Sequence, residues 1–193
     1  MLKTLFRISI LIGCFSFAVR AATAQEIVHA LIGTVSAINA NDKTITVNTD
    51  DGSDGTFHFM EDPHTPIKFD KGLRSESTAA TDFKTQDARV IVYYFGAGGG
   101  RTVVALKALG AGPFTKFSGT VVKYDKKEHS LSVQDQTGAI QSFTVASSTI
   151  AETDEGASEG LKFDPHKGQR VNVAATGAAG SQAAVYINGA LGF

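Results

Sequence analysis

The chain contains an internal repeat, which limits its fold more than any other feature. Gly33-Thr34-Val35 returns as Gly119-Thr120-Val121, 86 positions further along, and Ile45-Thr46-Val47 returns as Leu131-Ser132-Val133 at the same spacing. Gly52 and Phe57 also return at this spacing, as Gly138 and Phe143. Two later matches have a spacing of 81: Arg89-Val90-Ile91-Val92 with Arg170-Val171-Asn172-Val173, and Val104-Ala105-Leu106 with Val185-Tyr186-Ile187. The repeat predicts one structural module of roughly 80 residues that occurs twice.

Both copies carry the pattern of β-strands. Residues 44–48 and 56–59 alternate apolar and polar side chains with period two, and their counterparts in the second copy do the same. Asp51-Gly52 lies between these two strands. Asp-Gly is common in hairpin turns, because glycine adopts positive φ without steric cost. Further strands are expected at 90–95, 102–107, 171–174 and 183–188, and single helical turns at 75–83 and 153–160.

Five short strands per unit, with a longer excursion between the third and fourth, predict an all-β protein of two tandem five-stranded OB-like barrels. Small β-sandwiches are the alternative. Closing a barrel removes exposed strand edges. The expected units are residues 25–112 and 113–193, joined at Gly110-Ala111-Gly112-Pro113. We expect the two barrels to touch, because this linker is short, and each to fold alone.

Residues 1–24 have the features of a signal peptide. Lys3 and Arg7 precede the apolar residues 8–19, and Ala22-Thr23-Ala24 predicts cleavage before Gln25. The apolar stretch is too short for a stable membrane span, which needs ~20 residues. We therefore expect an exported protein, periplasmic or extracellular. As an alternative, Leu11-Ile12-Gly13-Cys14 resembles a bacterial lipobox, which predicts a lipoprotein anchored through Cys14.

The mature composition excludes several classes of function. Cys14 is the only cysteine, so cleavage leaves neither thiol catalysis nor thiolate metal sites. Loss of Lys3, Arg7 and Arg20 changes 18 basic against 19 acidic residues into 15 against 19, a net charge of −4. That charge argues against nucleic acid as a partner, because phosphate contacts dominate such affinity. An envelope protein or a polysaccharide is the expected partner.

The order of these motifs resembles a known family. A Gly-Thr-Val opening, an Ile-Thr-Val strand, an Asp-Gly turn, an aromatic strand and an Arg-Val-x-Val strand are similar to a widespread exported bacterial module, known only as a domain of unknown function. The resemblance covers both units and implies small OB-like barrels in tandem, without catalytic residues. The copies differ before the fourth strand, where Gln86-Asp87-Ala88-Arg89 stands against Lys167-Gly168-Gln169-Arg170.

Two glycine-rich segments suggest ligand sites. Gly96–Arg101 has the composition of a phosphate loop, but such a loop needs a following helix, and here a strand is expected. We therefore interpret it as a hairpin loop. Asp50, Asp51 and Asp54 gather carboxylates in one turn, as Ca²⁺ sites do, although the spacing is not that of an EF-hand. A solvated hairpin is the preferred interpretation, with weak cation binding as the alternative.

Two further groups suggest binding chemistry. His58, Met60 and His64 offer soft-metal ligands, and His58 and Met60 share one strand face. His58 is expected to be exposed. Lys68-Phe69-Asp70 recurs as Lys162-Phe163-Asp164. We interpret each phenylalanine as a plug that pins a loop to its barrel, with Lys and Asp facing water. A paired ligand-binding loop is the alternative.

No motif assigns a catalytic residue, a cofactor or a metal ligand. The chain has no G-x-S-x-G and no H-E-x-x-H sequence. It also lacks tryptophan; Tyr94, Tyr124 and Tyr186 are the expected surface aromatics. We therefore expect an exported, non-enzymatic binding or interaction module. The alternative is a periplasmic protein that binds a metal or a small ligand.

Overall fold

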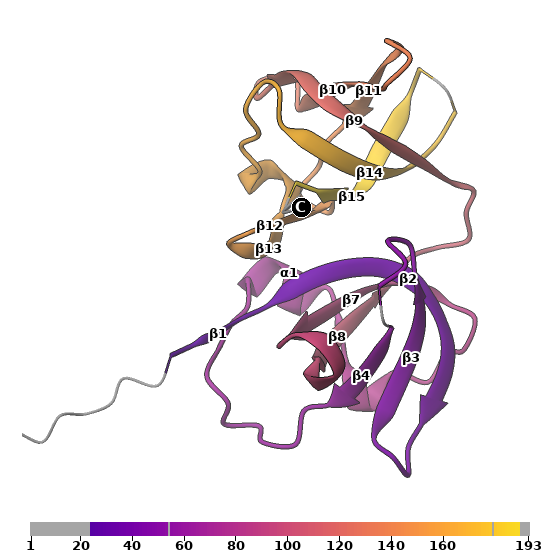
Figure 1. The fold of residues 1–193 in the computed structure, drawn as a ribbon, viewed down its shortest axis with the longest axis vertical. Coiled ribbons are helices and arrows are strands. Elements are labelled where there is room, and N and C mark those ends of the chain that lie inside the picture. The colour runs from indigo at the N-terminus through magenta and orange to yellow at the C-terminus, as the bar shows by residue number, and fades with distance from the viewer. Residues whose placement is uncertain (1–23, 54, 179, 190–193) are drawn as a thin grey trace, which may run out of the picture.

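The computed structural model describes residues 24–53, 55–178 and 180–189. The expected signal peptide, up to residue 23, and Cys14 lie outside this range. Two β-barrels are stacked along the long axis of the molecule, with the first copy below the second (Figure 1). The protein is therefore all-β and tandem, as the repeat predicted.

The first barrel is closed by five strands. β2 pairs antiparallel with β3 and β7, β3 pairs with β4, β7 pairs with β8, and β4 closes the ring by running parallel to β8. This is the OB-like arrangement that the pattern predicted. The strands are β2 (His29–Asn39), β3 (Thr44–Thr49), β4 (Thr56–Phe59), β7 (Arg89–Phe95) and β8 (Thr102–Ala108).

The second barrel repeats this connectivity. β9 pairs with β10 and β14, β10 with β11, β14 with β15, and β11 closes the ring parallel to β15. The strands are β9 (Phe114–Asp125), β10 (Ser130–Gln134), β11 (Ile140–Thr144), β14 (Arg170–Thr176) and β15 (Gln182–Asn188). The duplication therefore reproduced a whole barrel.

Repeated residues fill both barrel interiors. Val35, Ile45 and Phe57 are buried in the first core, and their counterparts Val121, Leu131 and Phe143 are buried in the second. The repeated glycine of Gly-Thr-Val has a steric cause. A Cβ at Gly33 would lie 2.6 Å from Asn48 O, and one at Gly119 would lie 2.2 Å from Gln134 O. Only glycine lets the first strand cross the second so closely.

The turn before the fourth strand keeps its geometry although its residue differs. Asp87 has φ 57° and Gly168 has φ 91°, so both are left-handed. The N–H of each donates to the valine of Gly-Thr-Val, Val35 O and Val121 O, at 2.9 Å. Aspartate is among the few non-glycine residues that tolerate this region. The first copy therefore departs from the glycine pattern in sequence only.

The excursions between the third and fourth strands differ between the copies. The first contains β5 (Ile67–Lys68), α1 (Lys71–Ser75), β6 (Thr78–Ala79) and η1 (Ala80–Asp82), and the second contains β12 (Ile150–Thr153), β13 (Gly156–Glu159) and η3 (Gly160–Lys162). The helical turn expected at 153–160 is wrong, because a hairpin turns there through Gly156 at φ 100°. The turn expected at 75–83 contains η1 but also the short strand β6, and α1 precedes it.

The Lys-Phe-Asp match is not a structural equivalence. Phe163 follows η3 and is buried in the second core, as predicted for a plug. In the first barrel the residue that follows η1 is Phe83, and it fills the corresponding place in that core. Phe69 instead packs partly buried against Tyr93, with ring centroids 5.0 Å apart. The plug interpretation is therefore wrong for Phe69.

The two barrels share a third apolar cluster. It joins Ile91, Tyr93 and Val104 of the first barrel to Ile150 and Tyr186 of the second. The strand β7 is buried on both faces, since Val90 and Val92 point into the first core while Ile91 and Tyr93 enter the shared cluster. The contact between the barrels is therefore a packed core and not a loose linker contact.

Candidate functional site

The contact is built on an unpaired edge of β2. Residues before Gly33 pair with β7 on one side only, since pairing with β3 begins at Gly33. The second barrel supplies the missing partners: Glu152 Oε2 accepts from Ala30 N at 2.7 Å, and Tyr186 Oη donates to Ala30 O at 2.8 Å. Ala157 N donates to Val28 O at 2.8 Å. Every one of these bonds joins the two copies.

Glu152 also binds His29, with Oε1 2.6 Å from Nδ1. The Glu152 side chain is 7% exposed and that of His29 is 32% exposed. The hydrogen bond to Glu152 raises the pKa of His29, although burial opposes this. Burial raises the pKa of Glu152, and its hydrogen bonds offset only part of that effect. The pair therefore holds its shared proton more tightly in the folded protein than in the unfolded chain.

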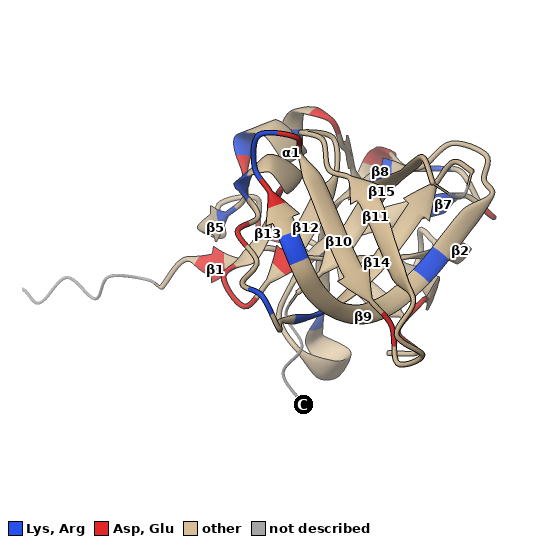
Figure 2. Cartoon of the chain, turned by 90° about the horizontal axis from the view of Figure 1, so that it is seen from above, with Lys and Arg blue, Asp and Glu red and all other residues tan. Residues whose placement is uncertain are grey.

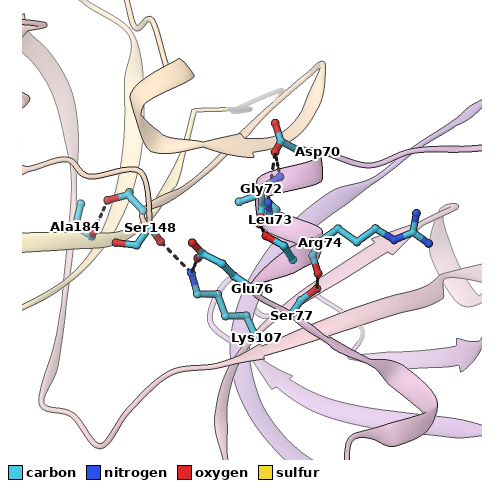
Figure 3. A network of polar contacts seen from close by, with 11 residues as sticks. Asp70, Gly72, Leu73, Arg74, Glu76, Ser77, Lys107, Ser148 and Ala184 are labelled. Carbon is cyan, nitrogen blue, oxygen red and sulfur yellow. Dashed lines mark hydrogen bonds and ion pairs between the residues drawn. The ribbon is translucent and has the colours of Figure 1, made fainter.

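Ion pairs surround the apolar contact. Asp50 contacts Arg89 of its own barrel and Lys116 of the second, the latter at 3.1 Å. At α1, Lys107 Nζ lies 2.6 Å from Glu76 and donates to Ser148 O of the second barrel at 3.2 Å (Figure 3). These contacts tie the barrels together at two ends of the contact, one beside Asp50 and the other beside α1.

Asp70 has two roles at the same end. Its Oδ1 accepts from Gly72 N at 2.8 Å and caps α1 (Figure 3), and its Oδ2 lies 2.6 Å from Lys162 Nζ. Burial alone would raise the pKa of Asp70, but Lys162 and the cap hydrogen bonds outweigh burial and lower it. Asp70 is therefore turned into the contact between the barrels and does not face water, which corrects the expectation for it.

Beside this end lies a hollow of about 650 Å³. Its walls come from both barrels: Val28, Lys68, Phe69 and Asp70 from the first, and the turn 153–158 with Lys162, Phe163, Asp164, Gln169 and Gly189 from the second. Ligand sites commonly occupy ~300–1,000 Å³ and prefer contacts between domains. We name this feature the interbarrel hollow.

The interbarrel hollow has an apolar floor and a charged rim. Val28 and Phe163 are buried, and Phe69 is half-buried. Lys162 is engaged by Asp70, and Asp164 by Lys126 at 2.9 Å. The turn residues Asp154 and Glu155 are exposed, and so is Lys68, the cation that the first barrel contributes to the rim. Charges of both signs lie on the side of the molecule that carries β1 (Glu26–Ile27), β13 and α1 (Figure 2).

The acidic turn is engaged by protein groups. Asp50 is only 14% exposed and is held by Arg89 and Lys116. Asp51 accepts from Ser53 N at 2.9 Å; its hydrogen bonds lower its pKa against the opposing effect of burial. Asp54 lies outside the described residues. Within residues 24–53, 55–178 and 180–189, no three His, Cys, Asp or Glu side chains gather as metal ligands would.

His58 and Met60 line a hollow of about 450 Å³ beside β4, and His64 is not among its lining residues. His58 is exposed, as expected from the strand alternation. The three candidate soft-metal ligands thus do not share one hollow.

The glycine-rich loop 96–101 joins β7 to β8 as a hairpin loop, and a strand follows it, as expected. Its Arg101 is buried, with the guanidinium 4.9 Å from the Phe57 ring centroid and 5.6 Å from that of Tyr94. The arginine therefore packs on aromatic rings of the first barrel.

The expectation that Tyr186 is a surface aromatic is wrong. The side chain does point out of its own barrel, as the alternation indicated, but the first barrel covers it and it is 5% exposed. Tyr94 and Tyr124 are half-buried. Strand alternation reports which face a residue occupies and not what covers that face.

Sequence reasoning missed His29 and Glu152, since 123 residues separate them and no spacing pattern links such a pair. The sequence does contain one signal that the outer face of β7 is covered. Residues 90–95 are apolar at every position, whereas their counterpart has Asn172 on the outer face. An uninterrupted apolar strand indicates burial on both faces.

In the described part of the chain, no helix has the length and apolar character needed to cross a membrane. A comparison with models of protein families finds no match, and a comparison with curated proteins finds no similar sequence. The family resemblance of the repeat therefore stays an expectation.

Proposed function

We propose that the protein is an exported, non-enzymatic binding module that takes its ligand in the interbarrel hollow. The observation that carries this proposal is the volume of about 650 Å³ with walls from both barrels. The hollow exists only because the barrels are docked, and the docking is made by hydrogen bonds to buried groups. A preorganised site of this kind binds without first ordering its own walls.

The rim favours a ligand with a cationic group. Asp154 and Glu155 are exposed at one side, and Lys68 is the opposing cation. The apolar floor of Val28, Phe69 and Phe163 suits an aliphatic or sugar-ring body. A basic peptide segment of an envelope protein and an amino sugar of a polysaccharide share this chemistry, an amine on a compact, partly apolar frame.

A binding role without catalysis is supported by the use of the titratable groups. His29 and Glu152 form a histidine–carboxylate pair, which is a frequent part of acid–base machinery. Here Glu152 accepts from Ala30 N across the barrels, and neither residue of the pair lines the interbarrel hollow. Their chemistry serves the contact between the barrels.

Thermal unfolding with defined probes tests the proposal. The probes are trilysine, a trimer of glucosamine, and the N-acetylated trimer, which lacks the amine. A ligand that binds only the folded state raises the melting temperature. We expect trilysine or the glucosamine trimer to raise it, which separates the peptide from the sugar source, and the acetylated trimer to leave it unchanged.

Matched variants locate the effect. The pair Asp154→Asn with Glu155→Gln is expected to abolish the shift, and Asp82→Asn with Glu128→Gln, at exposed positions outside the interbarrel hollow, to keep it. Equal shifts in both double variants, or no shift of the wild-type protein with either amine, contradict the proposal.

A further inference from the structure

Each barrel begins with a strand whose first half is paired on one side only. In the first barrel β2 pairs with β7 over His29–Thr34, but with β3 only from Gly33 onward. In the second, β9 pairs with β14 over Phe114–Thr120, but with β10 only from Thr120 onward. The segment Phe114–Gly119 therefore has one open edge, which we name the β9 edge.

The register fixes which backbone groups point out of this edge. Val35 N donates to Ala88 O, and Val121 N donates to Gln169 O, so the two barrels have the same hydrogen-bond phase. In an antiparallel ladder every second residue turns its N–H and C=O away from the partner strand. Counting back from these valines, the outward residues are Ala30 and Ile32 in β2, and Lys116 and Ser118 in β9.

The first barrel shows what such an edge binds. Ala30 uses both groups on the second barrel, through Glu152 at 2.7 Å and Tyr186 at 2.8 Å. Asp50 N donates to Ile32 O at 3.0 Å. In the second barrel the turn after β10 folds back on itself instead, with Asp135 N donating to Ala139 O. From the residues that the structure describes, no hydrogen bond reaches the outward backbone groups of Lys116 or Ser118.

The surroundings leave room at this edge. Lys116 and Ser118 are both exposed. A hollow of about 160 Å³ lies between Asp51 and Ser118, and a second of about 260 Å³ lies between Ser118 and Gln136. Both are lined by Ser118 and Asn172, so they adjoin at this point of β9.

We infer that the β9 edge is a strand-addition site that takes an extended peptide segment of a partner protein. The peptide main chain supplies the donors and acceptors that Lys116 and Ser118 lack, as in other β-additions. This surface is separate from the interbarrel hollow, with which it shares no lining residue.

Charge selects the partner. Lys116 occupies the middle of the edge, so pairing two copies there in antiparallel register brings two lysines together, and a lysine on an edge strand opposes self-pairing. An acidic residue opposite Lys116 is attractive instead: the Lys116 side chain is 60% exposed, and Asp50, which it contacts at 3.1 Å, is also held by Arg89. The site therefore favours a heterologous, extended, acidic segment over a second copy of this chain.

Nuclear magnetic resonance of the full mature chain tests the inference. In the free protein, the Ala30 amide is expected to exchange its hydrogen slowly and the Lys116 and Ser118 amides rapidly. The probe is the acetylated and amidated peptide Thr-Val-Thr-Glu-Thr-Val-Thr. Its addition is expected to shift the Lys116 and Ser118 signals and to slow their exchange. The same peptide with lysine in place of glutamate is expected to bind at least ~10-fold more weakly.

Variants decide between edge pairing and other contacts. Ser118→Pro removes an outward N–H while sparing the ladder with β14, and is expected to weaken binding at least ~10-fold, which corresponds to ~1.4 kcal/mol. If this variant does not fold, Lys116→Glu decides, because it is expected to reverse the preference between the two peptides, whereas the loss of its contact with Asp50 would not by itself reverse it. Lys123→Glu is the matched control, since Lys123 lies where β9 is paired with β10.

Four results would each overturn the inference. They are binding that Ser118→Pro leaves unchanged, signal shifts confined to residues other than Lys116 and Ser118, no shift at millimolar peptide, and self-association through the Lys116 and Ser118 amides.

Discussion

The hydrogen bonds of Glu152 predict how strongly one side chain holds the two barrels together. Its side chain is 7% exposed, and its carboxylate lies 2.6 Å from His29 Nδ1 and accepts from Ala30 N at 2.7 Å. Glu152→Ala leaves the Ala30 N–H without an acceptor, which costs ~1–3 kcal/mol, and removes the hydrogen bond to the half-buried His29, which adds ~1 kcal/mol. Since domains of this size are stable by only ~5–15 kcal/mol, the loss is large.

Glu152→Gln separates the charge from the shape. The amide oxygen still accepts from Ala30 N, so we expect a loss of only ~1–2 kcal/mol. Glu128→Gln is the control, because Glu128 is exposed on the β9–β10 turn and surface changes cost within ~0.5 kcal/mol.

Urea unfolding followed by far-ultraviolet circular dichroism measures these differences, since the chain has no tryptophan. A loss below ~1 kcal/mol for Glu152→Ala, or equal losses for the alanine and glutamine variants, would refute the reasoning that a buried acceptor holds the edge of β2.

Three further predictions concern the core, the pH dependence and the separated units. Phe83→Ala and Phe163→Ala are each expected to lower the free energy of unfolding in urea by ~3–5 kcal/mol, because both rings fill barrel cores. Phe69→Ala is expected to lower it by less than half as much, and equal losses for Phe69 and Phe83 would contradict their different roles. The pKa of His29 is raised by folding, so its stabilisation is complete below pH 6.5 and is lost as pH rises through the folded pKa; unfolding free energy should fall above pH 6.5, and a flat profile would count against the pair. Residues 25–112 alone are expected to form the barrel but to self-associate, because the shared cluster and the edge of β2 are uncovered; a monomer in light scattering would be the contrary result.

The barrels could be predicted because their determinants are local. Alternation along Thr44–Thr49 and the left-handed Gly52 report on neighbours in sequence, and the repeat doubled each signal. The turn at 153–160 shows the limit of this reasoning. From the sequence, a single helical turn is expected there, whereas Gly156 at φ 100° and the pairing of Ile150 with Glu159 make a hairpin.

The contact between the barrels could not be predicted in the same way. Ala30 and Tyr186 are 156 residues apart, and no period or motif connects them. The three-residue match of Phe69 with Phe163 misled because identity over so short a stretch ignores position in the fold, where Phe83 is the equivalent residue. The proposed interbarrel hollow inherits this limit, since its walls meet only after docking.

The covered edge of β2 limits how many barrels can associate head to tail. A lone barrel with an open edge and a face that fits that edge has the two complementary ends of a head-to-tail polymer, and such contacts grow into filaments unless the rotation closes a ring. Covalent duplication brought one edge onto one face within a single chain and thereby consumed both. Among the described residues, the edge of β9 stays open, and the first barrel has no counterpart of the β12–β13 hairpin that carries Glu152, so the tandem ends the series at two units. Fusion of two copies in this way stops head-to-tail polymerisation.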